Sequence, residues 1–434
     1  MKDLLRALLL VAVLVTLAAA SNARADDEEL AEKIDVLSDE IARLKEQLAV
    51  PETDEELKGA YGMGPAASRV YGVRQGVSIG GYGEFYFASP LEEKDESGAM
   101  SYADFYRFIS YFGYKFNDQI VMNTEIEFEH ATTGDGTGEA SVEFSYLDFL
   151  LSDAFNIRAG NLLVPSGITN VMHEPAYYHG NFRPDTETAI IPSTWRELGA
   201  GAHGSVAESF HYTAYVLNGL DGRDFGPSGV RGGRQKGGKV VWEDVGGIVA
   251  MEYDQRGVLQ VGGSVYVGGA DQGFVTDSGG EAIDVTNAIY EGHARYRWKG
   301  LELRGLVAAS TIDGASELTE ALFADPDDAA LVIPDQQLGY YVQAAYDVGP
   351  LLFGKDSTTQ FSPWIRFEQV DRHSDVPELA GRPKDESLNT TSVIFGLDVK
   401  PHPNVVIKVD YAHLSDAADS PLSDELRVGA GFVY

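Results

Sequence analysis

The chain of 434 residues contains no cysteine, which excludes disulfide frameworks, thiolate metal sites and cysteine nucleophiles. Long apolar runs are missing too, because no stretch after residue 25 offers the roughly 18 consecutive apolar residues that a membrane-spanning helix needs. Any insertion into a membrane would therefore require strands. Basic residues are scarce, with 33 Lys and Arg against 67 Asp and Glu and a formal charge of −34. This balance argues against nucleic acid as a partner, because phosphate contacts need a basic surface.

Three short segments precede the main part of the chain. Residues 1–25 have the pattern of a secretory signal peptide, with an apolar run over 7–17 and an A-x-A cleavage pattern at Ala23-Arg24-Ala25. Residues 26–50 predict a short coiled-coil helix on the periplasmic side, and an acidic solvated helix without a partner is the alternative. Residues 51–76, which are rich in glycine, are expected to be a linker. The apolar seam of the predicted helix consists of Leu30, Ile34, Leu37, Ile41, Leu44 and Leu48.

From residue 77 to residue 434 the apolar residues recur with a period of two. Ile126 and Phe128, for example, alternate with Glu125, Glu127 and Glu129, which predicts a strand with one apolar and one charged face. Many of these segments have about the 9 to 11 residues that a tilted strand needs to cross a bilayer. The expected strands are 77–87, 103–116, 119–130, 139–151, 155–164, 197–205, 208–218, 239–253, 257–268, 286–299, 301–311, 336–348, 359–371, 389–400, 404–414 and 423–434.

The connections between these strands are regular as well. Tight turns such as 117–118 and 299–300 alternate with long joins that are acidic or rich in glycine, as in membrane barrels with short periplasmic turns and longer outer loops. We therefore expect an all-β protein, a transmembrane antiparallel β-barrel of about 16 strands, over residues 77–434. A barrel of this size leaves an aqueous channel, whereas side chains fill a barrel of about eight strands.

Two ordered motifs carry a family resemblance. The stretch from Arg158 through Gly160 and Pro165 to Gly167 resembles the R-x-G-x(4)-P-x-G signature of the phosphate-selective porin O and P family. The strand Arg196-Glu197-Leu198-Gly199, followed by His203-Gly204, is similar to another motif of that family, and residues 212–219 resemble its next hairpin arm. The resemblance implies a sixteen-stranded trimeric pore with long loops folded into its lumen, which in some members conducts phosphate or related anions.

The charge of this chain departs from that family pattern. Residues 1–25 carry a net charge of +2 and residues 26–58 one of −9, which leaves −27 on the rest of the chain. We therefore take the architecture from the resemblance and leave the permeating solute open.

The charged strand faces should line the lumen, because a Lys or Arg that faces lipid at mid-depth costs roughly 2 to 4 kcal/mol. The glutamate row at 125, 127 and 129 would lie nearly opposite the arginines at 295, 297 and 304. This arrangement would produce a transverse field across the pore, unless each acid simply pairs with a base on an adjacent strand. The expected pore-lining residues are Arg107, Arg158, Glu125, Glu127, Glu129, Arg295, Arg297, Arg304, Arg366, Lys408 and Arg427.

The longest connection, residues 165–196, is rich in proline and should fold into the barrel as a constriction that carries Arg183 and Arg196. Its residues His173, Glu174 and His179 lack the H-E-x-x-H spacing, so neither a metal site nor a cofactor is expected. The basic residues of 221–239 would either gather anions at the outer mouth or form an exposed loop. The acidic residues of 312–335 would be solvated, or would hold Ca²⁺ or Mg²⁺ near lipopolysaccharide.

Taken together, these patterns predict a porin in the outer membrane of a Gram-negative bacterium. Such a protein is a water-filled channel for passive diffusion of ions and small polar solutes, is surrounded by outer-membrane lipid and lipopolysaccharide, and is a homotrimer. One alternative is an outer-membrane anchor or tether whose coiled coil binds the cell wall or a periplasmic partner. An enzyme is not expected, because the G-x-S-x-G match at residues 76–80 opens a predicted strand and lacks the strand-to-helix turn of a nucleophile elbow.

Overall fold

The computed structural model describes residues 59–91, 100–133, 138–276, 279–325, 328, 330–354 and 357–434. The signal peptide, the coiled-coil helix and residues 51–58 of the expected linker lie outside the described residues and stay predictions. Within the described ranges, no helix is long and apolar enough to cross a membrane.

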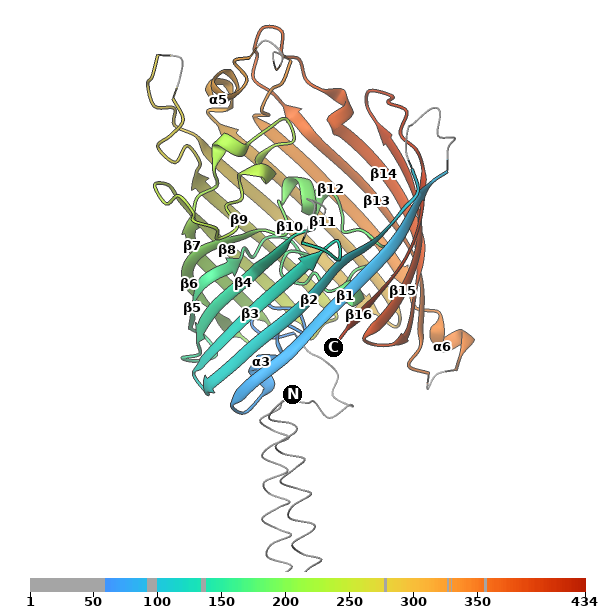
Figure 1. Cartoon of the computed structure of the whole chain (residues 1–434). Helices are drawn as coiled ribbons and strands as arrows, with labels where there is room; N and C mark the ends of the chain where they lie inside the picture. Colours follow the sequence, from blue (N-terminus) through green and yellow to red (C-terminus); the bar gives the residue numbers. More distant parts are fainter. Residues whose placement is uncertain are drawn as a thin grey trace, which may run out of the picture. The chain divides into compact units, whose positions relative to one another are not determined.

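Sixteen antiparallel strands of the described residues close into one barrel (Figure 1). Each strand pairs with its neighbours in sequence, and β1 closes the ring against β16. The predicted fold class is thereby confirmed. The first eight strands are β1 (Gly76–Pro90), β2 (Tyr102–Asn117), β3 (Ile120–Glu129), β4 (Ala140–Phe149), β5 (Asn156–Leu163), β6 (Arg196–Ala207), β7 (Phe210–Asn218) and β8 (Val245–Gln255). The others are β9 (Leu259–Gly269), β10 (Thr286–Trp298), β11 (Leu301–Asp313), β12 (Gln336–Tyr346), β13 (Gln360–Asp375), β14 (Asn389–His402), β15 (Val405–Asp416) and β16 (Glu425–Val433).

The expected strand ranges agree with these bounds to within four residues at all but one strand end. The exception is β8, which begins at Val245 and not at 239. Lys239 has a left-handed φ of 56°, which a strand does not accommodate. The backbone N–H groups of Val241 and Asp244 donate to the side chains of Gln235 and Gln272. Residues 239–244 therefore belong to the preceding loop.

The two strand faces differ as the alternation predicts. In β3 the side chains of Glu125 and Glu127 are buried inside the barrel, whereas Ile126 and Phe128 are 37% and 42% exposed. Large exposed apolar side chains recur on most of the other strands. The barrel thus presents an apolar outer surface and a polar inner one, the distribution that a membrane barrel requires.

Long and short connections lie at opposite ends of the barrel. Long connections, one of which contains helix α5 (Ala315–Leu322), lie at the end opposite the chain's C-terminus (Figure 1). The other end carries short turns, such as that between Trp298 and Leu301. The β12–β13 connection is a longer member of this second group and contains α6 (Gly349–Leu352).

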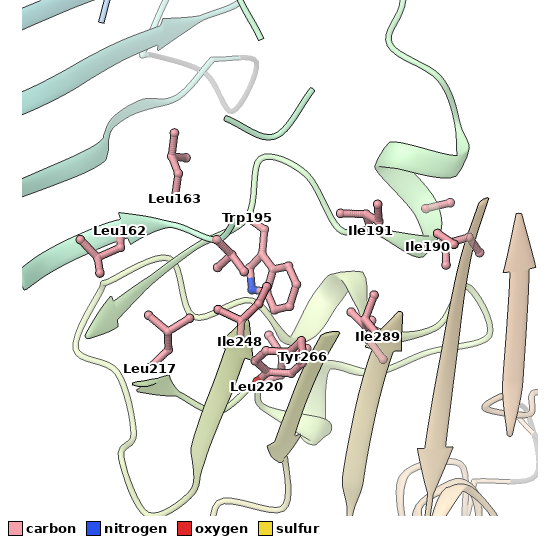
Figure 2. Packing of buried hydrophobic residues seen from close by; sticks show 14 of the residues in the cluster. Leu162, Leu163, Ile190, Ile191, Trp195, Leu217, Leu220, Ile248, Tyr266 and Ile289 are labelled. Carbon is pink, nitrogen blue, oxygen red and sulfur yellow. The ribbon is translucent and has the colours of Figure 1, made fainter. Parts of the chain in front are cut away.

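The connection between β5 and β6, residues 164–195, folds into the barrel, and we call it the constriction loop. It contains the 3-10 helix η1 (Pro175–Tyr177) and the π-helix η2 (Thr186–Ile190). Its Trp195 ring lies 4.8 Å from the Tyr266 ring of β9, measured between centroids. Figure 2 shows this apolar cluster, in which loop residues meet inward side chains of β5 and β7 to β10. Its labelled members are Leu162, Leu163, Ile190, Ile191, Trp195, Leu217, Leu220, Ile248, Tyr266 and Ile289.

This cluster fills the part of the interior next to these strands. Hydrophobic burial of the loop end against the wall stabilises the inward fold of the connection.

Candidate functional site

Polar contacts fix the middle of the constriction loop to strands around the ring. The Tyr178 hydroxyl donates to Glu84 of β1 over 2.7 Å, and the backbone N–H of Asn181 donates to Asp410 of β15 over 2.9 Å. Thr186 donates its backbone N–H and its hydroxyl to Glu368 of β13 over 2.7 and 2.8 Å.

Wall cations hold the backbone of the same loop. Lys408 of β15 donates from Nζ to the Gly180 carbonyl over 2.8 Å, and Arg366 of β13 donates from Nη2 to the Phe182 carbonyl over 3.3 Å. Arg304 of β11 reaches the Tyr177 carbonyl over 3.2 Å. The loop therefore spans the interior and is held at several points, as a rigid constriction requires.

A second segment, residues 60–72 with helix α3 (Arg69–Gly72), also enters the interior. The Glu174 carboxylate of the constriction loop accepts the backbone N–H groups of Ala66 and Ala67 over 2.9 and 3.3 Å. A Cβ at Gly64 would lie 2.6 Å from the same carboxylate, so a larger residue there would displace the Glu174 side chain from these hydrogen bonds. Asn123 of β3 donates to the Ala67 carbonyl over 2.7 Å. Residues 60–72 were expected to be part of a linker. Their glycines and proline show neither the alternation of a strand nor the spacing of an amphipathic helix.

Opposite charges face one another across adjacent strands of the inner wall. In the ladder registers, Glu84 is paired with Arg107 and Asp148 with Arg158, and their side chains form ion pairs of 2.9 and 2.8 Å. Three further register pairs repeat the pattern, namely Arg297 with Glu302, Asp398 with Lys408, and Asp410 with Arg427.

The two groups that were expected to form a transverse field are involved in such local contacts. Glu127 lies 3.9 Å from Arg107 of the neighbouring strand. Arg297 and Arg304 both form ion pairs with Glu302, over 2.8 and 2.9 Å, and Arg295 donates to Gln260. These contacts favour the alternative in which acids and bases on neighbouring strands pair and polarise the wall only locally.

The two residues assigned to the constriction occupy different positions. Arg183 lies in the middle of the loop and is almost fully buried. Arg196 is the first residue of β6, where it lies 3.7 Å from Glu143 and donates to the Ser141 hydroxyl over 3.0 Å.

A cavity of about 460 Å³ lies beside the constriction loop. It is bounded by the loop, by β2, β3 and β13, and by the β7–β8 connection. Four arginines and two acids line it, so its charged groups sum to about +2. These charged residues are Arg107, Glu129, Arg183, Asp185, Arg231 and Arg372.

The β7–β8 connection contributes to this cavity because it is folded onto the constriction loop. Arg231, in the 3-10 helix η4 (Val230–Gly233), donates to the carbonyls of Thr188 and Ser193. Arg234 donates to the carbonyls of Pro192 and Thr194 over 3.1 and 3.0 Å. The bases of residues 221–239 are divided, because Arg231 and Arg234 are held by the constriction loop whereas Arg223, Lys236 and Lys239 are exposed. That they gather anions stays a prediction. Arg372 was not among the expected pore-lining residues, because the strand expected over 359–371 ended one residue before it, whereas β13 continues to Asp375.

No family model matches the chain. A protein of Aquifex aeolicus (strain VF5), described as uncharacterized, is 32% identical over 399 residues, which are 90% of this chain and 87% of that protein.

Solved structures of similar fold come from outer membranes. The anion-selective porin from Comamonas acidovorans has a TM-score of 0.53 at 10% identity, and the match covers 83% of this chain and 100% of that one. A loop-deletion mutant of the Vibrio cholerae outer membrane protein OmpT has a TM-score of 0.52 at 14% identity, with the same coverage. The outer membrane channel DcaP of Acinetobacter baumannii has a TM-score of 0.50 at 11% identity, over 83% of this chain and 97% of that one. At these identities the likeness shows the fold alone.

Proposed function

This chain belongs to the family of the Aquifex aeolicus protein, and from its closed sixteen-stranded barrel and its likeness in fold to porins we propose that it is an outer-membrane porin. It forms a water-filled channel through which ions and small polar solutes diffuse passively, and it catalyses no reaction. The observation that carries the proposal is the cavity beside the constriction loop inside a closed sixteen-stranded barrel. An anchor does not need a polar interior of this size, whereas a channel does.

The lining of the cavity favours anions. Four guanidinium groups face two carboxylates there, and arginine binds phosphate and carboxylate oxygens with paired hydrogen bonds. The formal charge of −27 on the chain outside residues 1–58 weighs less, because charges more than about 10 Å from the narrowest point are largely screened at 0.1 M salt. Small anions, with phosphate among them as the resemblance to the phosphate-selective family implies, are the proposed preferred solutes.

The same proposal predicts what the protein contacts in the membrane. The apolar outer surface contacts outer-membrane lipid, the outer loops contact lipopolysaccharide, and three copies form a homotrimer. A tether that uses the N-terminal helix to bind the cell wall is the rival function, and it requires no conduction.

Planar-bilayer recordings of the purified protein test the channel and its selectivity. We expect stepwise conductance, and a reversal potential in a salt gradient that indicates weak anion preference. The variants Arg183→Glu and Arg372→Glu should each shift the reversal potential toward cations. At 1 M salt, where the Debye length is about 3 Å, these shifts should shrink.

Arg256→Glu is the matched control, because this arginine lies on a turn with 89% of its side chain exposed. It should leave the reversal potential unchanged. Folded protein that never conducts would exclude the channel and leave the tether, and an equal shift from the control would mean that the cavity does not set selectivity.

A further inference from the structure

Three metal-ligating side chains converge where the constriction loop meets β3 and β4. His173 of the loop places Nε2 at 3.2 Å from Glu125 Oε1 and at 3.9 Å from Glu143 Oε2. One ligand atom from each of the three residues lies within 4.8 Å of the others. The two glutamates are 0% exposed and the histidine is 2% exposed, so bulk water does not solvate the cluster.

The hydrogen bonding of His173 leaves an acceptor directed at the two carboxylates. Its Nδ1 lies 3.0 Å from the Asn170 carbonyl, a contact that requires the hydrogen on Nδ1 because a carbonyl only accepts. The contact of 3.2 Å between Nε2 and Glu125 Oε1 is a hydrogen-bond distance, so without a metal ion one of these two atoms must carry a proton. In the neutral ring Nε2 carries a lone pair instead, which a cation between it and the two carboxylates can accept. Among the described residues, neither oxygen of Glu143 nor Oε2 of Glu125 has a hydrogen-bond partner.

Nearby bases compensate this cluster only in part. Arg196 lies 3.7 Å from Glu143 Oε1, and Arg107 on β2 is already paired with Glu84 over 2.9 Å. Arg183 of the constriction loop attracts both glutamates of the cluster from a longer distance. Two buried carboxylates and an imidazole lone pair therefore face one another around a shared space. Buried charges of this kind are stable only when they are paired or coordinate a metal.

We propose that Glu125, Glu143 and His173 bind a divalent transition-metal ion of the Zn²⁺ class. One imidazole nitrogen and two carboxylate oxygens suit Zn²⁺, whereas Ca²⁺ and Mg²⁺ prefer sets of oxygen ligands only. The hydrogen bond from Nδ1 to a backbone carbonyl is the usual outer-shell support of a metal-binding histidine. The ion connects the constriction loop to β3 and β4, and its binding does not depend on whether the barrel conducts.

His179 of the same loop provides an internal comparison. Its Nδ1 lies 2.7 Å from Asp398 and its Nε2 lies 3.8 Å from Glu302. The two carboxylates contact different ring nitrogens and so lie on different sides of the imidazole. They cannot join one nitrogen around a common ion, which makes His179→Ala a matched control.

The test uses the folded full-length protein in detergent, stripped with EDTA and titrated with ZnCl₂. We expect one tightly bound Zn²⁺ per chain by calorimetry and metal analysis, and a higher melting temperature on binding. Co²⁺ in place of Zn²⁺ should give visible absorption bands that report nitrogen and oxygen ligands. Glu143→Gln and His173→Gln should weaken binding by more than the roughly 10- to 100-fold that is typical of lost outer-shell partners, while His179→Ala should bind like the parent.

Glu143→Gln is isosteric and keeps the packing, and circular dichroism checks that the barrel of each variant is folded. The absence of stoichiometric binding to the folded parent would overturn the proposal and mean that protons compensate the cluster instead. Equal binding by the parent and by folded Glu143→Gln would overturn it as well, because the ion would then lie elsewhere. Neither result affects the conductance test of the channel.

Discussion

At the scale of single residues, Glu174 connects the two segments that enter the barrel. Its side chain is buried, accepts two backbone N–H groups from residues 66 and 67, and lies in the constriction loop outside the strands. Burial raises the pKa of Glu174 to about 7, despite the hydrogen bonds to Ala67 and Ala66 that oppose the shift. The neutral carboxyl is therefore favoured in the folded protein over a wider range of pH than in the unfolded chain.

This pKa predicts a pH-dependent contribution to stability. Because the folded pKa lies above the unfolded value near 4.5, the contribution is complete below pH 4.5 and is lost as the pH rises through about 7. The full loss is on the order of 3 kcal/mol, from about 1.4 kcal/mol per pKa unit. Glu174→Gln, which stays neutral, should therefore gain stability relative to the parent between pH 4.5 and 8, as measured by the melting temperature of the EDTA-treated protein in detergent.

The control for this experiment is Glu208→Gln, on a turn where 93% of the glutamate side chain is exposed. Its melting temperature should follow that of the parent at every pH. If Glu174→Gln also follows the parent throughout, the carboxyl of Glu174 does not titrate in this range.

Single residues also show what the sequence can and cannot predict. The alternation in β2 and β3 indicated that Arg107 and Glu127 point inward, and the structure buries both. The partner of Arg107 was not predictable, because it depends on the register of β1 against β2, which places Glu84 opposite it. The cluster around His173 was missed for a related reason. A search for ligand spacing on one helix does not detect a loop histidine that meets acids from two strands.

At the scale of elements, the constriction loop was predictable from its length and prolines, but the way it is held was not. The sequence does not reveal that Trp195 and Ile190 pack against inward apolar residues of β5 and β7 to β10. Period-two alternation predicts only that such residues face inward. Whether they contact water or apolar side chains depends on how the constriction loop folds. The predicted start of β8 was wrong for a similar reason, since Val241 donates its backbone N–H to Gln235 of the same connection and Asp244 donates its own to the more distant Gln272.

A deletion tests the role of this element. Residues 177–188 contact Glu84, Asp410 and Glu368 on three different strands. Their removal should widen the passage and raise single-channel conductance, because water can then solvate the carboxylates that the loop now covers. Planar-bilayer recordings of the refolded deletion protein provide the measurement.

The matched control removes residues 417–421 from an outer connection whose side chains are mostly exposed. That deletion should leave conductance unchanged. A correctly folded 177–188 deletion with the parent's conductance would mean that this segment does not limit the flow.

At the scale of the whole molecule, the barrel was the most predictable feature because two independent patterns agree on it. Strand alternation and the alternation of short and long connections both depend on the bilayer, which requires strands long enough to cross it and one apolar face on every strand. The assembly of several copies is a different matter. Assembly depends on surfaces between chains. Our prediction of it is based on the apolar seam expected over residues 26–50 and on the family resemblance.

We therefore predict that the intact protein is a trimer whose N-terminal segment strengthens the association. Heptads that place Leu and Ile at a and d positions drive helices together, but fewer than three heptads contribute too little to hold an assembly by themselves. Deletion of residues 26–58 should consequently leave barrels that still conduct, with trimers that dissociate at a lower temperature. Mass measurement in detergent across a temperature series gives both the oligomeric state and the dissociation midpoint. Replacing Leu37 and Leu44 by Ala in the intact chain should lower the midpoint in the same direction, while a stable monomer of the unmodified protein would contradict the trimer.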